Sequence, residues 1–233
     1  MITEAIILAG GLGTRLRSVV DDIPKCMAPV NGIPFIACVI DNLQKKGVQR
    51  FIFSLGYKSE IVISFLEEKY QALEKIYEIE NEPLGTGGAI AAACKKVKGN
   101  NVLIINGDTL FDINLKSFSL FHSNKAADCS IALKPMINIE RYGTVDINNR
   151  NTVIAFNEKK FCQNGLINGG VYILNVRHFL QEDLPLAFSF EKKYLENLFS
   201  VRPMFGIIMD DYFIDIGIPE DYERAQIELV PGS

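Results

Sequence analysis

Ala5–Leu16 reads AIILAGGLGTRL, an apolar run of strand length that ends at two glycines, takes a third, and reaches Arg15 before helical periodicity can begin. Pro24 and Lys25 follow shortly after it. Glycines at a strand-to-helix turn let a ligand approach the main chain closely, and the free N–H groups of the turn then point at an anion. Arg15 and Lys25 add full positive charges. The stretch therefore predicts a phosphate-binding loop between a parallel strand and a helix.

Two other phosphate-binding loops fit these residues poorly. The stretch lacks the Gly-Lys-Ser/Thr ending of a Walker A loop, and the dinucleotide pattern Gly-x-Gly-x-x-Gly, read from Gly11, would need glycine where Leu16 stands. A glycine-lined turn without a ligand is the structural alternative. The nearby cations Arg15 and Lys25 disfavour that alternative.

The motif GGLGTRL at positions 10–16, together with Pro24-Lys25, resembles the signature of the sugar-1-phosphate nucleotidylyltransferases, which join a nucleoside triphosphate to a sugar 1-phosphate and release pyrophosphate. The resemblance covers almost the whole chain and is closest to the D-glycero-α-D-manno-heptose 1-phosphate guanylyltransferase branch. It implies an α/β fold with a Rossmann-like mixed, mostly parallel sheet flanked by helices, the nucleotidyltransferase A-type fold. It also implies GTP, a heptose 1-phosphate and Mg²⁺. Another sugar 1-phosphate (mannose, glucose or N-acetylmuramate), with UTP or another triphosphate, stays open.

Length and composition fit one domain. A chain of 233 residues with 48% hydrophobic content can bury a sizeable core. We expect a single domain over residues 1–233, with a nucleotide-binding half up to about residue 125 and a sugar-phosphate half from about 126. A net charge of -4 disfavours broad binding to nucleic acid or to a membrane surface, so anions must meet local cations, for which Arg15, Lys25 and Lys159 are the candidates. Nothing in the sequence indicates the oligomeric state.

The five cysteines predict reduced thiols, because their number is odd and no pair has a C-x-x-C or metal-ligand spacing. The chain enters a strand within a few residues of its first position, which does not fit a signal peptide. No apolar run approaches membrane-spanning length. We therefore expect a cytoplasmic protein.

Strand and helix patterns alternate through about residue 125, which favours a mostly parallel sheet with helices on both faces. Beyond that point strands follow one another with fewer helices, which favours a mixed sheet. Predicted strands cover 5–9, 50–54, 76–79, 102–105, 129–133, 144–147, 152–156 and 171–174, and predicted helices cover 35–43, the region around 61–66, 89–94, 190–199 and 219–229.

Two aspartates are candidate metal ligands. Asp108 directly follows a buried apolar strand, where α/β sheets place their ligands, and Asp215 lies in an apolar context before Gly217. Mg²⁺ takes one or two carboxylates and fills its other positions with phosphate oxygens and water. The structural alternatives are a turn cap at Asp108 and an Asx turn at Asp215. The upstream phosphate loop favours the metal, and the family resemblance implies it.

A second glycine-rich helix entry lies at 85–88, where close helix packing and ligand binding are equally open from the spacing. It resembles the family's L-G-T-x-G-A element, which lines the nucleobase pocket. Just upstream, Glu80 or Glu82 could accept both the N1–H and the 2-amino group of guanine, which favours GTP. The predicted nucleotide-binding residues are Leu8, Ala9, Gly10, Gly11, Gly13, Thr14, Arg15, Lys25, Glu80, Glu82, Gly85, Thr86, Gly88 and Asp108.

The sugar-phosphate site rests on the resemblance. An E-K pair in the family binds the sugar, which implies that Glu158 accepts hydrogen bonds from hydroxyls and that Lys159 meets the phosphate; a solvated charged turn is the alternative. The family often has proline after this pair, whereas this chain has Lys160, so the shape of the turn stays open. The implied residues are Gly143, Glu158, Lys159, Asn168, Gly169 and Gly170.

The predicted reaction is a single displacement at the α-phosphorus of the triphosphate. A sugar phosphate is mostly dianionic near neutral pH, with a second pKa of about 6, so it needs no general base, and we expect structural roles for His122 and His178. Charge neutralisation and alignment are what the reaction requires. The predicted catalytic residues are Arg15 on the leaving pyrophosphate, Lys25 on the reacting phosphates, and Asp108 and Asp215 on Mg²⁺.

Two other classes of function fit the sequence less well. A binding or regulatory paralogue without turnover is disfavoured because the four predicted catalytic residues are intact. A dehydrogenase is disfavoured by the missing final glycine of its dinucleotide pattern.

Overall fold

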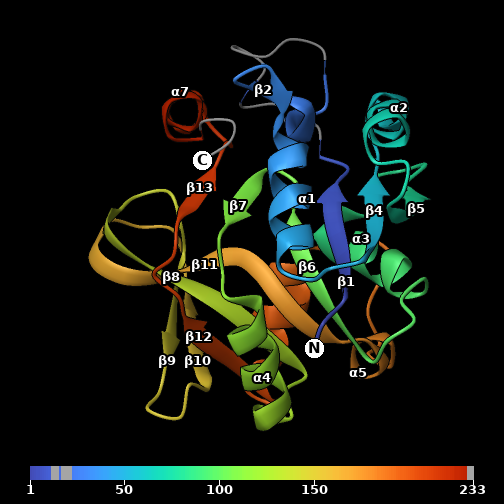
Figure 1. Ribbon diagram of the computed structural model, residues 1–233. Coiled ribbons are helices and arrows are strands. Elements are labelled where there is room, and N and C mark those ends of the chain that lie inside the picture. Colours follow the sequence, from blue (N-terminus) through green and yellow to red (C-terminus); the bar gives the residue numbers. More distant parts are fainter. Residues whose placement is uncertain (12–15, 17–22, 230–233) are drawn as a thin grey trace.

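The computed structural model describes residues 1–11, 16 and 23–229. Its main sheet has the strand order β10 (Val153–Asn157), β9 (Thr144–Ile147), β11 (Cys162–Asn175), β6 (Asn101–Asn106), β1 (Glu4–Ala9), β4 (Arg50–Leu55) and β5 (Glu74–Ile79) (Figure 1). Two further strands continue from β11, with β8 (Cys129–Ile139) paired to β11 and β12 (Met204–Ile208) paired to β8.

The strands β6, β1, β4 and β5 are parallel and form the first half of the sheet. Ile6 lies in register with Ile52 and Ile104, and its neighbour Ile7 with Phe53 and Ile105. These two rows belong to separate hydrophobic clusters, because successive side chains of a strand point to opposite faces. Both faces of β1, β4 and β6 are therefore buried, as their continuous apolar runs predict, whereas β5 at the edge is only partly buried.

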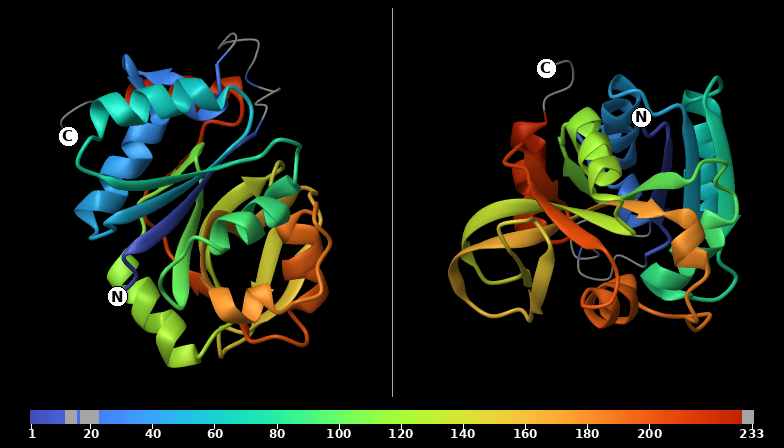
Figure 2. Two further views of the ribbon diagram at one scale, coloured as in Figure 1. Left: turned by 90° about the vertical axis from the view of Figure 1, so that its right-hand side faces the viewer. Right: turned by 90° about the horizontal axis from the view of Figure 1, so that it is seen from below.

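Helices cover both faces of this sheet (Figure 2). The cluster that contains Ile7 takes in α1 (Phe35–Lys45) and α2 (Ser59–Lys69), whereas the cluster that contains Ile6 takes in α3 (Gly85–Cys94), α5 (Val176–Leu180) and the π-helix η2 (Phe190–Leu195). The remaining α-helices are α4 (Leu115–Lys125), α6 (Glu196–Leu198) and α7 (Pro219–Glu228). The expected α/β fold, with a mixed sheet flanked by helices, is thus confirmed.

The second half of the sheet begins where β11 pairs antiparallel with β6 on one side and with β8 on the other. The start of the strand predicted over 171–174 was wrong, because β11 starts at Cys162 and contains Asn168, Gly169 and Gly170 as well. The register with β8 shifts between Asn168 and Tyr172, and Gly170 has a φ of +69°. Asn and Gly here mark an irregularity within a long strand instead of a turn before it.

Two short sheets lie outside the main sheet. In one of them β13 (Phe213–Asp215) pairs antiparallel with β7 (Thr109–Phe111), and Asp215 lies opposite Thr109. The other is the hairpin of β2 (Pro29–Val30) and β3 (Ile33–Pro34), which α7 holds through a hydrogen bond of 2.6 Å from the Tyr222 hydroxyl to the Pro29 carbonyl.

The five cysteines are all free, and three of them, Cys26, Cys94 and Cys129, are buried. Among the helices of the described ranges, none combines the length and the apolar composition needed to cross a membrane.

Candidate active site

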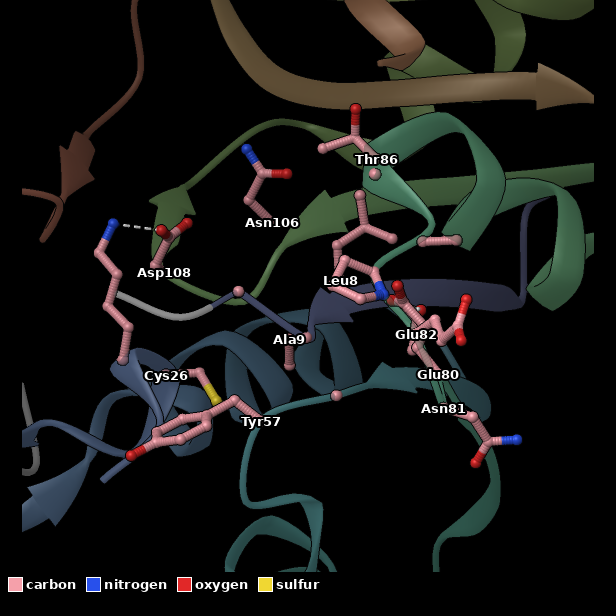
Figure 3. Close-up of a pocket in the computed structure, with 18 of the residues that line it drawn as sticks. Leu8, Ala9, Cys26, Tyr57, Glu80, Asn81, Glu82, Thr86, Asn106 and Asp108 are labelled. Carbon is pink, nitrogen blue, oxygen red and sulfur yellow. Dashed lines mark hydrogen bonds and ion pairs between the residues drawn. The ribbon is translucent and has the colours of Figure 1, made fainter. Parts of the chain in front are cut away.

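Two cavities open at the carboxyl ends of the parallel strands, where open α/β sheets bind ligands. The first, of about 690 Å³, lies between the glycine turn after β1, the ends of β4 and β5, and the start of α3 (Figure 3). The second, of about 720 Å³, is lined mainly by residues from β7 to β11 and from η2. Asn106 and Gly217 line both cavities, so the two spaces adjoin.

A charged centre lies where the cavities adjoin. The Lys25 ammonium, on the 3₁₀-helix η1 (Lys25–Met27), forms an ion pair with Asp108 and lies 3.7 Å from Oδ1 of Asp215. The pairing of β7 with β13 brings the two aspartates together, because Asp108 immediately precedes β7 and Asp215 ends β13. Asp215 also forms the Asx turn of the structural alternative, since its Oδ1 accepts a hydrogen bond of 2.8 Å from the Gly217 N–H.

The electrostatics of this centre favour a further cation. Burial raises the pKa of Asp215, the negative charge of Asp108 raises it as well, and Lys25 opposes both effects. Two carboxylates against one ammonium leave an excess of negative charge. Within the described ranges, His, Cys, Asp and Glu form no group of three or more that could hold a metal ion. A divalent cation at Asp108 and Asp215 would therefore take its remaining ligands from phosphate and water, as Mg²⁺ commonly does.

The glycine turn forms one wall of the first cavity. Leu8, Ala9, Gly10 and Gly11 line it. A Cβ atom on Gly10 would lie 2.9 Å from Oε1 of Glu80 and 3.3 Å from the Gly56 backbone nitrogen, so the chain at Gly10 approaches both segments closely. The other predicted residues of this loop, Gly13, Thr14 and Arg15, lie outside the described residues.

Glu80 and Glu82 both line the first cavity but differ in their surroundings. Glu80 accepts hydrogen bonds from the Leu84 N–H at 3.0 Å and from the Ser54 hydroxyl at 3.2 Å, which fix its carboxylate against the glycine turn. Glu82 is exposed. Both carboxylates can face a ligand in this cavity, with that of Glu80 held by two hydrogen bonds and that of Glu82 exposed.

The glycines at 85–88 start α3 and allow a very close contact with the chain before η2. Gly85 has a φ of +68°, and a Cβ atom there would lie 2.6 Å from the Phe188 carbonyl oxygen. Gly88 is buried against the backbone of Leu186. Close helix packing therefore accounts for the glycines at positions 85 and 88. Gly85 and Thr86 also line the first cavity, so packing and ligand binding are compatible here.

Thr86 links the walls of the two cavities. Its hydroxyl donates to Oε2 of Glu191 at 2.8 Å and accepts from the Phe190 N–H at 2.8 Å. Thr86 lines the first cavity and Glu191 the second, so one hydrogen bond joins them. The Ser189 hydroxyl donates to the same Glu191 oxygen at 2.8 Å.

Replacing Thr86 by Val is expected to lower the free energy of unfolding by about 1 to 3 kcal/mol, because the buried Phe190 N–H loses its acceptor while the side-chain shape is kept. Thr86→Ser retains the hydroxyl and is the matched control. Urea denaturation of the three proteins measures the effect. Equal midpoints for the Val and Ser variants would show that the hydroxyl contributes nothing to the link.

The second cavity gathers all six residues that the family resemblance implies for the sugar phosphate, although they are spread over positions 143–170. They meet because β9, β10 and β11 are neighbours in the sheet. Glycine is favoured at two of these positions, since a Cβ atom at Gly143 would lie 2.6 Å from the Asn157 carbonyl oxygen, and Gly170 has a φ of +69°. One cavity is thus lined by all six residues, Gly143, Glu158, Lys159, Asn168, Gly169 and Gly170.

The sequence patterns do not identify several of the residues that line the two cavities. Asn106 lines both cavities, and its place directly before Gly107-Asp108 could have singled it out. Arg141 and Glu191 line the second cavity. Arg141 is two residues from the predicted Gly143, whereas Glu191 reaches the site only through the packing of η2 on α3, which no local pattern shows.

The two histidines lie away from both cavities, in agreement with their expected structural roles. His122 is buried, with Nδ1 2.9 Å from the Ser130 hydroxyl, and burial lowers its pKa to about 4. His178 places Nδ1 2.5 Å from Oδ1 of Asp128. Neither can serve as a general base on a ligand in these cavities.

A family model described as "Nucleotidyl transferase" matches residues 4–230, and the chain therefore belongs to the nucleotidyl transferase family. It is 50% identical to the D-glycero-alpha-D-manno-heptose 1-phosphate guanylyltransferase of Aneurinibacillus thermoaerophilus, over 97% of this chain and 98% of that protein. The enzyme of the same name from Campylobacter jejuni is 46% identical over 94% of this chain and 96% of its own length. The family expected from the sequence is thus confirmed, and with it the class of enzyme.

Solved structures of similar fold match the chain over almost its whole length. The crystal structure of HddC from Yersinia pseudotuberculosis has a TM-score of 0.89 and 39% identity, covering 98% of this chain and 100% of that one. Its complex with GMP-PN has a TM-score of 0.88 at 38% identity, with the same coverage. A putative glucose-1-phosphate thymidylyltransferase from Bacillus anthracis shares the fold, with a TM-score of 0.81 at 21% identity over 97% of this chain and 94% of that one.

Proposed function

We propose that the protein transfers GMP from GTP to D-glycero-α-D-manno-heptose 1-phosphate, giving GDP-heptose and pyrophosphate for bacterial surface polysaccharide synthesis. The observation that carries this proposal is the pair of adjoining cavities with Lys25, Asp108 and Asp215 between them. The names of the relatives at 50% and 46% identity, and the GMP-PN complex of HddC, support the choice of nucleotide and sugar.

In this proposal GTP occupies the first cavity and the sugar phosphate the second. The dianionic sugar phosphate attacks the α-phosphorus directly, and Asn106 and Gly217 mark the boundary across which the new bond forms. Lys25 stabilises the negative charge on the reacting phosphates, and Arg15 holds the leaving pyrophosphate. Catalysis then consists of alignment and charge neutralisation.

Asp108 and Asp215 fit Mg²⁺, because their carboxylates lie together beside a single ammonium and leave an excess of negative charge. The ion would neutralise phosphate oxygens when bound.

The proposal includes the number of domains and the cellular location of the protein. We propose one domain over residues 1–233, because β11 of the sugar-phosphate half pairs directly with β6 of the nucleotide half. A cytoplasmic location is supported by the five cysteines, none of which forms a disulfide.

If Glu80 or Glu82 recognises guanine, replacing the responsible residue by Gln should abolish discrimination between GTP and ITP, which lacks only the 2-amino group. The loss of a hydrogen bond to a charged group corresponds to about 1.5 to 3 kcal/mol, or roughly tenfold to a hundredfold in kcat/KM. The GTP/ITP ratio of kcat/KM is measured for the wild type, Glu80→Gln and Glu82→Gln. The same ratio in all three proteins would show that neither carboxylate accepts the 2-amino group.

A substrate panel tests the proposed function. Four nucleoside triphosphates are combined with heptose, mannose, glucose and N-acetylated sugar 1-phosphates, and pyrophosphate release is followed. The highest kcat/KM is expected for GTP with the heptose phosphate. Higher kcat/KM with another pair would assign the enzyme to that sugar nucleotide, and no release with any pair would favour a paralogue that binds without turnover.

A further inference from the structure

Arg141 is held in place at the wall of the second cavity. Its Nη2 donates to Oδ2 of Asp221 in α7, and its guanidinium carbon lies 5.4 Å from the centre of the Tyr142 ring. The Asp221 side chain is only 10% exposed, whereas that of Arg141 is 43% exposed. A buried carboxylate and a ring therefore fix the direction of this side chain while part of it stays open to the cavity.

The guanidinium of Arg141 keeps donors for a ligand. It carries five N–H groups, and the hydrogen bonds it forms within the described part of the chain, to Asp221 and to the Tyr142 hydroxyl at 3.5 Å, all involve Nη2. The donors on Nε and Nη1 are not used by either contact. A planar fork with free N–H groups matches the oxygens of a phosphate.

The other cations of the second cavity are placed less firmly. Lys192 is paired with Glu196 at 3.0 Å on the surface of η2 and α6, and Lys159 lies in an exposed turn after β10. Arg141 instead lines the cavity together with Asp215, whose negative charge acts on the guanidinium, and with Gly217, which marks the end that adjoins the first cavity. A phosphate that attacks across the boundary has to lie at this end.

We propose that Arg141 binds the phosphate group of the sugar 1-phosphate, in a position fixed in advance by Asp221. This inference rests on the proposed function and adds a specific cation to it. Binding a group equally in the ground state and the transition state raises affinity without changing kcat. Arg141 is therefore a substrate-binding residue whose removal affects KM.

Arg224 provides a matched control, since its Nη1 donates to the other Asp221 oxygen at 3.0 Å. Its remaining contacts are the Phe213 carbonyl at 3.2 Å and Glu228 at 3.3 Å, and it lines neither cavity. Removing Arg224 therefore disturbs the same buried carboxylate without removing a cavity donor.

In Arg141→Gln the KM for the sugar 1-phosphate should rise roughly tenfold to a hundredfold, the range for a lost hydrogen bond to a charged group. We expect kcat, the KM for GTP and all constants of Arg224→Gln to stay near the wild-type values. Arg141→Lys keeps the charge without the fork, so its KM should lie between those of the wild type and Arg141→Gln, and it serves as the test should Arg141→Gln fail to fold.

An unchanged KM for the sugar 1-phosphate in Arg141→Gln would overturn the inference and leave the proposed function intact. An equal rise in Arg224→Gln would overturn it too, because the effect would then come from Asp221. If the wild type releases no pyrophosphate with any acceptor, the proposed function fails. Calorimetric titration with the heptose 1-phosphate and with inorganic phosphate then tests Arg141 separately, and equal affinities of the wild type and Arg141→Gln would refute the inference.

Discussion

Asp108→Asn and Asp215→Asn are each expected to lower kcat by at least about a hundredfold, the scale of losing a group that stabilises charge in the transition state. Both carboxylates lie at the Lys25 ammonium, where the two cavities adjoin. Asparagine keeps the shape of either side chain but removes the charge that would hold a divalent cation. Steady-state rates over a range of Mg²⁺ concentrations measure the effect.

Asp112→Asn is the matched control for these variants. Asp112 follows β7 directly and is paired with Lys46 at 2.5 Å, but it lines neither cavity. Its replacement should leave kcat near the wild-type value. If Asp108→Asn or Asp215→Asn shows rates close to wild type at limiting Mg²⁺, the replaced aspartate is not a ligand of the metal ion.

Lys25→Ala should lower kcat far more than it weakens GTP binding, by about a hundredfold or more, the scale of removing a group that stabilises transition-state charge. An interaction that strengthens as charge develops affects kcat, whereas one that is equal in both states affects only KM. The Lys25 side chain is 13% exposed and lies between two carboxylates, so its ammonium is already positioned.

Rapid-quench measurements of kcat and equilibrium binding of GTP separate the two effects in Lys25→Ala. Lys46→Ala removes a lysine that pairs with Asp112 outside the cavities and should change neither quantity. Weaker GTP binding with unchanged kcat would make Lys25 a docking residue instead of a catalytic one.

Local patterns were sufficient for the parts of the site that follow directly from single strands. The glycine turn after β1 and the position of Asp108 after β6 depend only on where an apolar run ends, and the sequence shows this directly. The inner parallel strands β1, β4 and β6 could be predicted in the same way, since strands buried on both faces give continuous apolar runs.

The remaining features depend on contacts between distant segments. Asn168–Gly170 could mark either a turn or an irregularity in a strand, and only the pairing of β11 with β8 decides between them. Met204–Ile208 was not predicted as a strand, although it pairs with β8 over its full length. The Thr86–Glu191 hydrogen bond joins residues 105 positions apart, and Arg141 is fixed by Asp221, 80 positions away.

The fate of the α-phosphorus tests the central claim most directly. The protein is incubated with Mg²⁺, D-glycero-α-D-manno-heptose 1-phosphate and GTP labelled at the α-phosphorus, and the products are separated by chromatography. Transfer of GMP predicts that the label appears in GDP-heptose, in amounts equal to the unlabelled pyrophosphate released. Label that remains in GTP, or that appears in GMP without a sugar, would contradict nucleotidyl transfer to this acceptor.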